Sequence, residues 1–91
     1  MTGASEPVRT SETTLDLRGQ RVDEALDRVD EFLDGLLSRG EQAGFILHGH
    51  GTGRLKSAVR NHLETSAYVD RAQPAGPDDG GDAFTVVWLA P

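Results

Sequence analysis

Hydrophobic residues recur along this chain with two different spacings, and the spacings predict helices and strands in alternation. Within Val22–Ser38 they recur every three or four residues, which is typical of an amphipathic helix. Gly40 follows shortly afterwards, where a glycine commonly ends a helix. Before this helix, Leu15 and Leu17 alternate with polar residues, so residues 13–18 are expected to form a strand with one buried face.

The middle of the chain predicts a buried strand followed by a second helix. Ala43–Leu47 is apolar without alternation, which favours a strand buried on both faces. A helix is expected from residue 53 or 54 to residue 65, with Thr52 as its N-cap. Its inward-facing residues are expected to be Leu55, Val59 and Leu63.

The C-terminal third predicts two strands joined by a loop. Residues 68–72 are expected as a short strand, residues 73–82 as a loop rich in proline and glycine, and Phe84–Leu89 as a valine-rich strand. The predicted order is therefore β-α-β-α-β-β. Strand–helix–strand connections favour parallel pairing, and the last two strands are expected to pair antiparallel. We expect an α/β two-layer sandwich with a four-stranded mixed sheet and two helices.

The length of 91 residues allows one domain, expected at residues 13–91, with residues 1–12 as a disordered arm or linker. The chain has no cysteine, which excludes disulfides and thiolate metal sites and is consistent with a reducing cytoplasm. No apolar run approaches the roughly 20 residues of a membrane helix. We expect a cytoplasmic, monomeric domain that does not bind membranes.

Charge is unevenly distributed along the chain, whose net charge is −6. Residues 23–34 contain six acids and one base, Arg28, whereas residues 48–62 contain no acid, three bases and three histidines. A phosphate backbone would approach only the second segment. The alternative is that both segments are solvated helix faces.

A glycine-rich loop, His48–Gly-His-Gly-Thr-Gly53, precedes the second helix and is a candidate phosphate site. Its glycines permit positive φ angles and a close approach of backbone to ligand. The N-terminus of a helix also attracts anions. The spacing matches neither the dinucleotide fingerprint nor a P-loop, so a plain structural turn remains the alternative. The candidate phosphate-binding residues are Gly49, His50, Gly51, Thr52, Gly53, Arg54 and Lys56.

Candidate catalytic residues are expected at the same edge of the sheet, because parallel strands joined by a helix end on one side. They are Asp16, Arg18, Glu24 and His48. Asp16 and Arg18 form either an exposed ion pair or, through Arg18, a phosphate clamp. His48 is either a structural hydrogen-bonding residue or a general acid–base. Glu24 either compensates the helix dipole or, with Asp16, binds a divalent cation such as Mg or Mn.

Three segments in this order resemble the Smr (small MutS-related) family. They are Leu15-Asp-Leu-Arg-Gly19, Glu24-Ala25, and His48-Gly-His-Gly-Thr-Gly-Arg-Leu55. The chain has Arg18 where many family members have histidine, and in this it is similar to the Smr domain attached to a bacterial MutS paralogue.

The resemblance implies the two-layer fold described above, related to the C-terminal domain of bacterial translation initiation factor three. It implies an endonuclease that nicks DNA, in repair or recombination, or cleaves RNA, in ribosome rescue. Asp16, Arg18, His48, Gly49 and Gly51 fall on the family's functional motifs. The alternatives are a non-catalytic module that binds nucleic acid or the ribosome, and a protein-interaction domain that uses its acidic helix.

Overall fold

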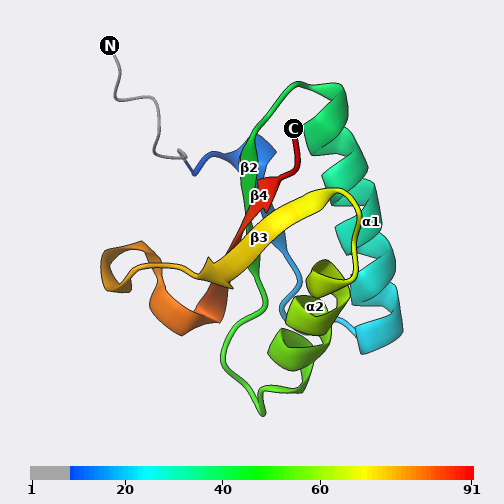
Figure 1. Ribbon diagram of the computed structural model, residues 1–91. Coiled ribbons are helices and arrows are strands. Elements are labelled where there is room, and N and C mark those ends of the chain that lie inside the picture. The colour runs from blue at the N-terminus through cyan, green and yellow to red at the C-terminus, as the bar shows by residue number, and fades with distance from the viewer. Residues whose placement is uncertain (1–8) are drawn as a thin grey trace.

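Two helices lie on one face of a four-stranded sheet in the computed structural model, which describes residues 9–91 (Figure 1). The helices are α1 (Val22–Ser38) and α2 (Arg54–Glu64), and the strands are β1 (Thr14–Asp16), β2 (Ala43–Leu47), β3 (Val69–Pro74) and β4 (Phe84–Leu89). No helix of this described part is long and apolar enough to cross a membrane.

The strands lie in the order β1-β2-β4-β3. β1 pairs parallel with β2, placing Leu15 opposite Ile46, whereas β4 pairs antiparallel with both β2 and β3. The predicted α/β two-layer sandwich, with its mixed sheet and two helices, is confirmed. The long connection through α1 lets β1 and β2 run in the same direction, as expected of a strand–helix–strand unit.

The main core lies between the sheet and the helices. Alternate strand residues face the helices, because successive side chains of a strand point to opposite faces. Leu17, one residue past β1, is fully buried in this core and donates its N–H to Leu47 O at 2.8 Å. The core residues are Leu15, Leu17, Ala25, Val29, Leu33, Leu36, Ile46, Val59, Leu63 and Val87.

The opposite face of the sheet has a smaller cluster of Phe45, Ala75 and Val86. The guanidinium of Arg9 lies 4.4 Å from the centroid of the Phe84 ring, and its Nη1 donates to Asp79 O at 2.8 Å. Within the expected arm, Arg9 makes these contacts and Glu12 O accepts from Arg39 Nη2 at 2.7 Å, whereas residues 1–8 lie outside the described residues.

Element boundaries differ from the predictions mainly at turns. β1 ends at Asp16, two residues before the expected end, and β3 extends to Pro74, into the segment expected to be a loop. β3 is an edge strand, so a residue without an N–H is tolerated there. The loop after it contains two short 3₁₀ helices, Pro77–Asp79 and Gly81–Ala83.

The predicted N-cap of α2 is wrong. Gly53 occupies the N-cap position with φ 84°. As a glycine it has no side chain that could cap the helix. Only glycine adopts that left-handed backbone at little cost, which suits Gly53 to this position. Thr52 lies one residue before the N-cap. The Thr52 hydroxyl still accepts the Arg54 N–H, at 3.3 Å.

Gly44→Ala should destabilise the domain, because β2 packs closely on α1 at Gly44. A Cβ there would lie 2.6 Å from Leu36 Cδ1 and 3.0 Å from the Phe32 ring. We expect a loss of about 1–3 kcal/mol in the free energy of unfolding, measured by urea denaturation.

The control for this substitution is Gly35→Ala within α1, where the added methyl meets only the guanidinium of Arg39. It should stabilise the helix by up to about 1 kcal/mol. Equal stabilities of the Gly44→Ala variant and the unaltered chain would contradict the close packing.

Candidate nucleic-acid interface

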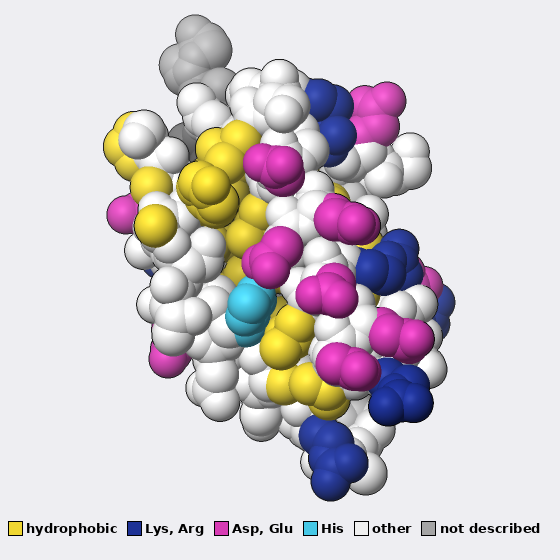
Figure 2. Space-filling view, turned by 90° about the vertical axis from the view of Figure 1, so that its right-hand side faces the viewer, with side chains coloured by type: hydrophobic (Ala, Val, Ile, Leu, Met, Phe, Trp, Pro, Cys, Tyr) yellow, Lys and Arg dark blue, Asp and Glu magenta, His cyan; other side chains and the backbone are white. Residues whose placement is uncertain are grey.

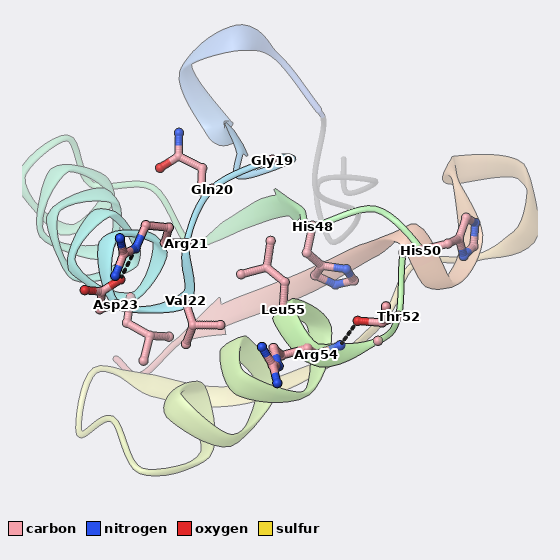
Figure 3. Close-up of a pocket in the computed structure, with 13 residues that line it drawn as sticks. Gly19, Gln20, Arg21, Val22, Asp23, His48, His50, Thr52, Arg54 and Leu55 are labelled. Atoms are coloured by element: carbon pink, nitrogen blue, oxygen red, sulfur yellow. Dashed lines mark hydrogen bonds and ion pairs between the residues drawn. The ribbon is translucent and has the colours of Figure 1, made fainter.

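A cleft of about 780 Å³ lies at the edge of the sheet where β1 and β2 end (Figure 3). One wall is residues 19–23, the turn from β1 into α1. The other wall is His48 and residues 50–55, the glycine loop with the first turn of α2. The predicted meeting of these two segments is observed, and parallel pairing is its cause.

The first half of the glycine loop is tied to the segment that precedes β4. The N–H groups of His48 and Gly49 both donate to Ala83 O, at 3.1 and 3.0 Å. These two amides are therefore not available to a ligand. The φ angles of Gly49, Gly51 and Gly53 are all positive, at 78°, 42° and 84°, so the loop uses the freedom that its glycines provide.

The N-terminus of α2 supplies amides that a ligand can use. Within residues 9–91, no hydrogen-bond acceptor is found for the N–H groups of Leu55 and Lys56. Such free amides, together with the helix dipole, favour a bound anion. The exposed Arg54 adds positive charge to the same turn, and Arg21 adds it across the cleft, where Arg21 Nε lies 3.5 Å from Asp23 Oδ1.

Lys56 does not line the cleft, although the sequence suggested that it would bind phosphate. Its Nζ pairs with one carboxylate oxygen of Asp82, and Arg60 Nη2 lies 2.9 Å from the other. The hydrogen bonds from Lys56 and Arg60 lower the pKa of Asp82 to about 2. Asp82 therefore engages both cations on this side of α2 and offsets one of their two positive charges.

Asp16 and Arg18 form a two-point ion pair beside the cleft. Arg18 Nε and Nη2 donate to the two carboxylate oxygens at 3.1 and 2.8 Å. These hydrogen bonds lower the pKa of Asp16, so its carboxyl is ionised at neutral pH. The Arg18 stem contacts the loop, since a Cβ on Gly49 would lie 3.3 Å from Arg18 Cγ.

The ion pair and His48 lie at one edge of the sheet but on opposite faces. Leu15 and Leu17 face the helices, so the alternating Asp16 and Arg18 point to the other face. His48 instead lies on the helix side and lines the cleft. The expectation that all these groups enter one site is therefore only partly met.

His48 is 5% exposed, and both of its ring nitrogens have partners. Nδ1 lies 3.0 Å from Gly49 O, and Nε2 lies 2.8 Å from Thr85 Oγ1. Burial lowers the pKa of the imidazole, and the positive charge of Arg60 acts in the same direction. This geometry is that of the structural hydrogen-bonding residue, one of the two roles that the sequence left open.

The remaining candidates lie apart from one another. Glu24 is exposed in the first turn of α1 and does not line the cleft. His50 lines it from an exposed turn, with its ring directed away from His48 (Figure 3). Among residues 9–91 no three His, Cys, Asp or Glu residues gather closely enough to hold a metal ion, so Asp16 and Glu24 belong to no such group.

The sequence did not indicate two functional residues beside the loop, Thr85 and Asp82. Thr85 is fully buried and hydrogen-bonds His48, while Asp82 pairs with Lys56 and Arg60. For Thr85 the sequence holds one signal, because it is the single hydroxyl residue in the apolar run Phe-Thr-Val-Val-Trp-Leu. Its position predicts which face it occupies but not its partner.

The comparisons with known proteins agree with this fold and with these motifs. The model of the Smr domain matches residues 15–90, which is most of the chain. The chain belongs to the Smr domain family. The resemblance found in the sequence is thereby confirmed.

This Smr domain is similar to part of much longer proteins. It is 54% identical over 78 residues to the endonuclease MutS2 of Anaeromyxobacter sp. (strain Fw109-5), and 39% identical over 76 residues to that of Ligilactobacillus salivarius (strain UCC118). These alignments cover 86% and 84% of this chain but 10% of each relative. The chain therefore spans about a tenth of the length of the curated relatives it matches.

Two solved structures share its architecture. The crystal structure of the Smr domain of Thermus thermophilus MutS2 has a TM-score of 0.85 at 40% identity, covering 87% of this chain and 99% of that one. YdaL, a stand-alone small MutS-related protein from Escherichia coli, has a TM-score of 0.84 at 26% identity, covering 92% and 69%.

The ion pairs of Asp82 predict how the stability of this Smr domain depends on pH. The pKa of Asp82 is about 2 in the folded chain, below the usual unfolded value of about 3.9. Its contribution to stability is complete above the unfolded pKa and is lost as the pH falls through the folded one. Asp82→Asn should therefore reduce the acid-induced loss of stability between about pH 4 and 2.

Urea denaturation at several pH values measures this difference. Asp78→Asn is the matched control, because no ion pair of Asp78 is found in residues 9–91. An Asp82→Asn variant that loses stability with acid as steeply as the unaltered chain would contradict the assignment.

Proposed function

We propose that this domain binds the phosphate backbone of nucleic acid in the cleft and acts as an endonuclease domain on DNA or RNA. The observation that supports it best is the first turn of α2. There the free amide of Leu55 and the exposed Arg54 line the open cleft, and the free amide of Lys56 follows in the same turn. A backbone phosphate matches the charge and hydrogen-bonding capacity of that position.

The charge distribution restricts how a nucleic acid would approach. Figure 2 shows acidic side chains spread over the helix-covered side of the molecule. The exposed acids of α1 are Asp23, Glu24, Asp27, Asp30, Glu31 and Asp34. A polyanion would be repelled along that helix. It would therefore contact the domain at the loop end, where the cleft opens.

The cleavage step would use the residues beside the loop. Arg18 lies against Gly49 and is well exposed, so its guanidinium would stabilise charge on a phosphate held at the loop. Asp16 is half exposed beside the loop, and its role would be to accept a proton or to serve as one ligand of a Mg or Mn ion whose other ligands are phosphate oxygens and water. Relatives that carry this domain are named endonucleases, which supports phosphodiester cleavage as the reaction.

A second function is favoured by the same contacts. Asp16 and Arg18 satisfy each other, and both nitrogens of His48 are engaged. Groups already paired in this way suit a domain that binds nucleic acid, alone or in the ribosome, and leaves the chemistry to another part of a larger protein.

Arg54→Gln should weaken nucleic-acid binding and flatten its salt dependence. Removing one phosphate contact lowers the slope of log K against log salt by about one unit. Binding of a labelled branched DNA duplex and of a hairpin RNA, measured by anisotropy at several salt concentrations, tests this.

Arg39→Gln is the matched control for binding. It changes the net charge equally but lies at the far end of α1, about 25 Å along the helix axis from its start at the cleft. Equal effects of the two substitutions would mean that the contact is not at the cleft.

Asp16→Ala should abolish cleavage while leaving binding nearly intact. Nicking of plasmid DNA and cleavage of structured RNA are measured with and without EDTA, alongside Asp34→Ala as a control on the exposed surface of α1. Cleavage lost only in Asp16→Ala supports the endonuclease. Binding without cleavage in the unaltered chain favours the binding module, and equal cleavage by all variants excludes Asp16 from the reaction.

A further inference from the structure

A chain of hydrogen bonds, buried at its centre, joins α2, β4 and the glycine loop. Arg60 Nε donates to Thr85 Oγ1 at 2.8 Å, and Thr85 Oγ1 lies 2.8 Å from His48 Nε2. The other ring nitrogen, Nδ1, lies 3.0 Å from Gly49 O. Thr85 has no exposed surface, so its hydroxyl cannot exchange these partners for water.

The direction of each hydrogen bond follows from the atoms involved. A carbonyl oxygen only accepts, so Nδ1 of His48 carries the proton and donates to Gly49 O. An uncharged imidazole then has Nε2 free of hydrogen, and it accepts the Thr85 hydroxyl. Arg60 donates to a lone pair of the Thr85 oxygen, so the hydroxyl proton of Thr85 remains available for His48 Nε2.

We propose that Thr85 is a positioning residue, whose hydroxyl holds His48 in one tautomer and one orientation and thereby holds the glycine loop at the cleft. The ring can position the loop because Nδ1 of His48 is hydrogen-bonded to the Gly49 carbonyl. Ala83 O holds the same part of the loop by accepting the His48 and Gly49 amides. The ligand that this loop would receive, a nucleic-acid phosphate, rests on the proposed function.

The charges around His48 agree with an uncharged ring. Arg60 and Lys56 of α2 face it with two positive charges, and Asp82 beside β4 supplies one negative charge. A third positive charge on a buried imidazole would be repelled by those of Arg60 and Lys56. Its burial also lowers the pKa of His48, so the uncharged form predominates at neutral pH.

The test compares Thr85→Val with Thr85→Ser in the full 91-residue chain. Valine retains the shape of threonine without the hydroxyl, whereas serine retains the hydroxyl. Nitrogen-15 NMR of the His48 ring should show protonated Nδ1 and unprotonated Nε2 in the unaltered chain and in Thr85→Ser. In Thr85→Val we expect a mixture of tautomers and shifted amide resonances from residues 49–53.

Binding provides the second measurement. Thr85→Val should weaken binding of the labelled branched DNA duplex by about tenfold, the scale of one lost buried hydrogen bond, whereas Thr85→Ser should restore it to within about twofold. Both are measured well below the melting temperature of each variant, so a loss of stability alone would leave the dissociation constant unchanged.

Two results would overturn the proposal. One is a His48 ring protonated at Nε2 in the unaltered chain, which requires no variant to fold. The other is a Thr85→Val variant whose tautomer and loop amides match those of the unaltered chain. If the unaltered chain binds no nucleic acid, the proposed function fails, and the NMR measurements still decide the role of Thr85.

Discussion

The cleft depends on the parallel pairing of β1 with β2. Leu15 lies opposite Ile46, and the Leu17 N–H extends the pairing to Leu47 O at 2.8 Å. Both strands then end at one edge, so the turn into α1 and the loop before α2 form opposite walls. An antiparallel pairing would place these walls at opposite ends of the sheet, and no such cleft would exist.

A second constraint comes from β4, which lies between β2 and β3. The segment before β4 accepts two loop amides at Ala83 O, and Thr85 on the strand holds the His48 ring. Local glycine conformations allow the loop to turn, but they do not select one conformation among many. These contacts from a distant part of the chain do so, and they hold the loop beside the first turn of α2 at the cleft.

Charge is arranged so that a strongly acidic domain still offers an anion a place to bind. Lys56 and Arg60 both pair with Asp82, whereas Arg54 at the cleft is exposed. The exposed acids of α1 lie on the helix side of the molecule, where Figure 2 shows acidic side chains interspersed with basic and apolar ones. Binding at the cleft would therefore rely on main-chain amides and few side-chain charges, and repulsion would disfavour contact along α1.

The sequence by itself determined the elements and their order. The bounds of α1, β2 and β4 were predicted correctly, because hydrophobic periodicity is a local property that neighbouring residues express. The parallel strand–helix–strand unit then required the glycine loop and Asp16 to reach one edge. Tertiary structure alone decided that Asp16 and His48 occupy opposite faces, that Asp82 takes Lys56, and that Thr85 binds His48. Those outcomes depend on register and side-chain packing between segments more than 25 residues apart in the chain, where no local pattern specifies the partner.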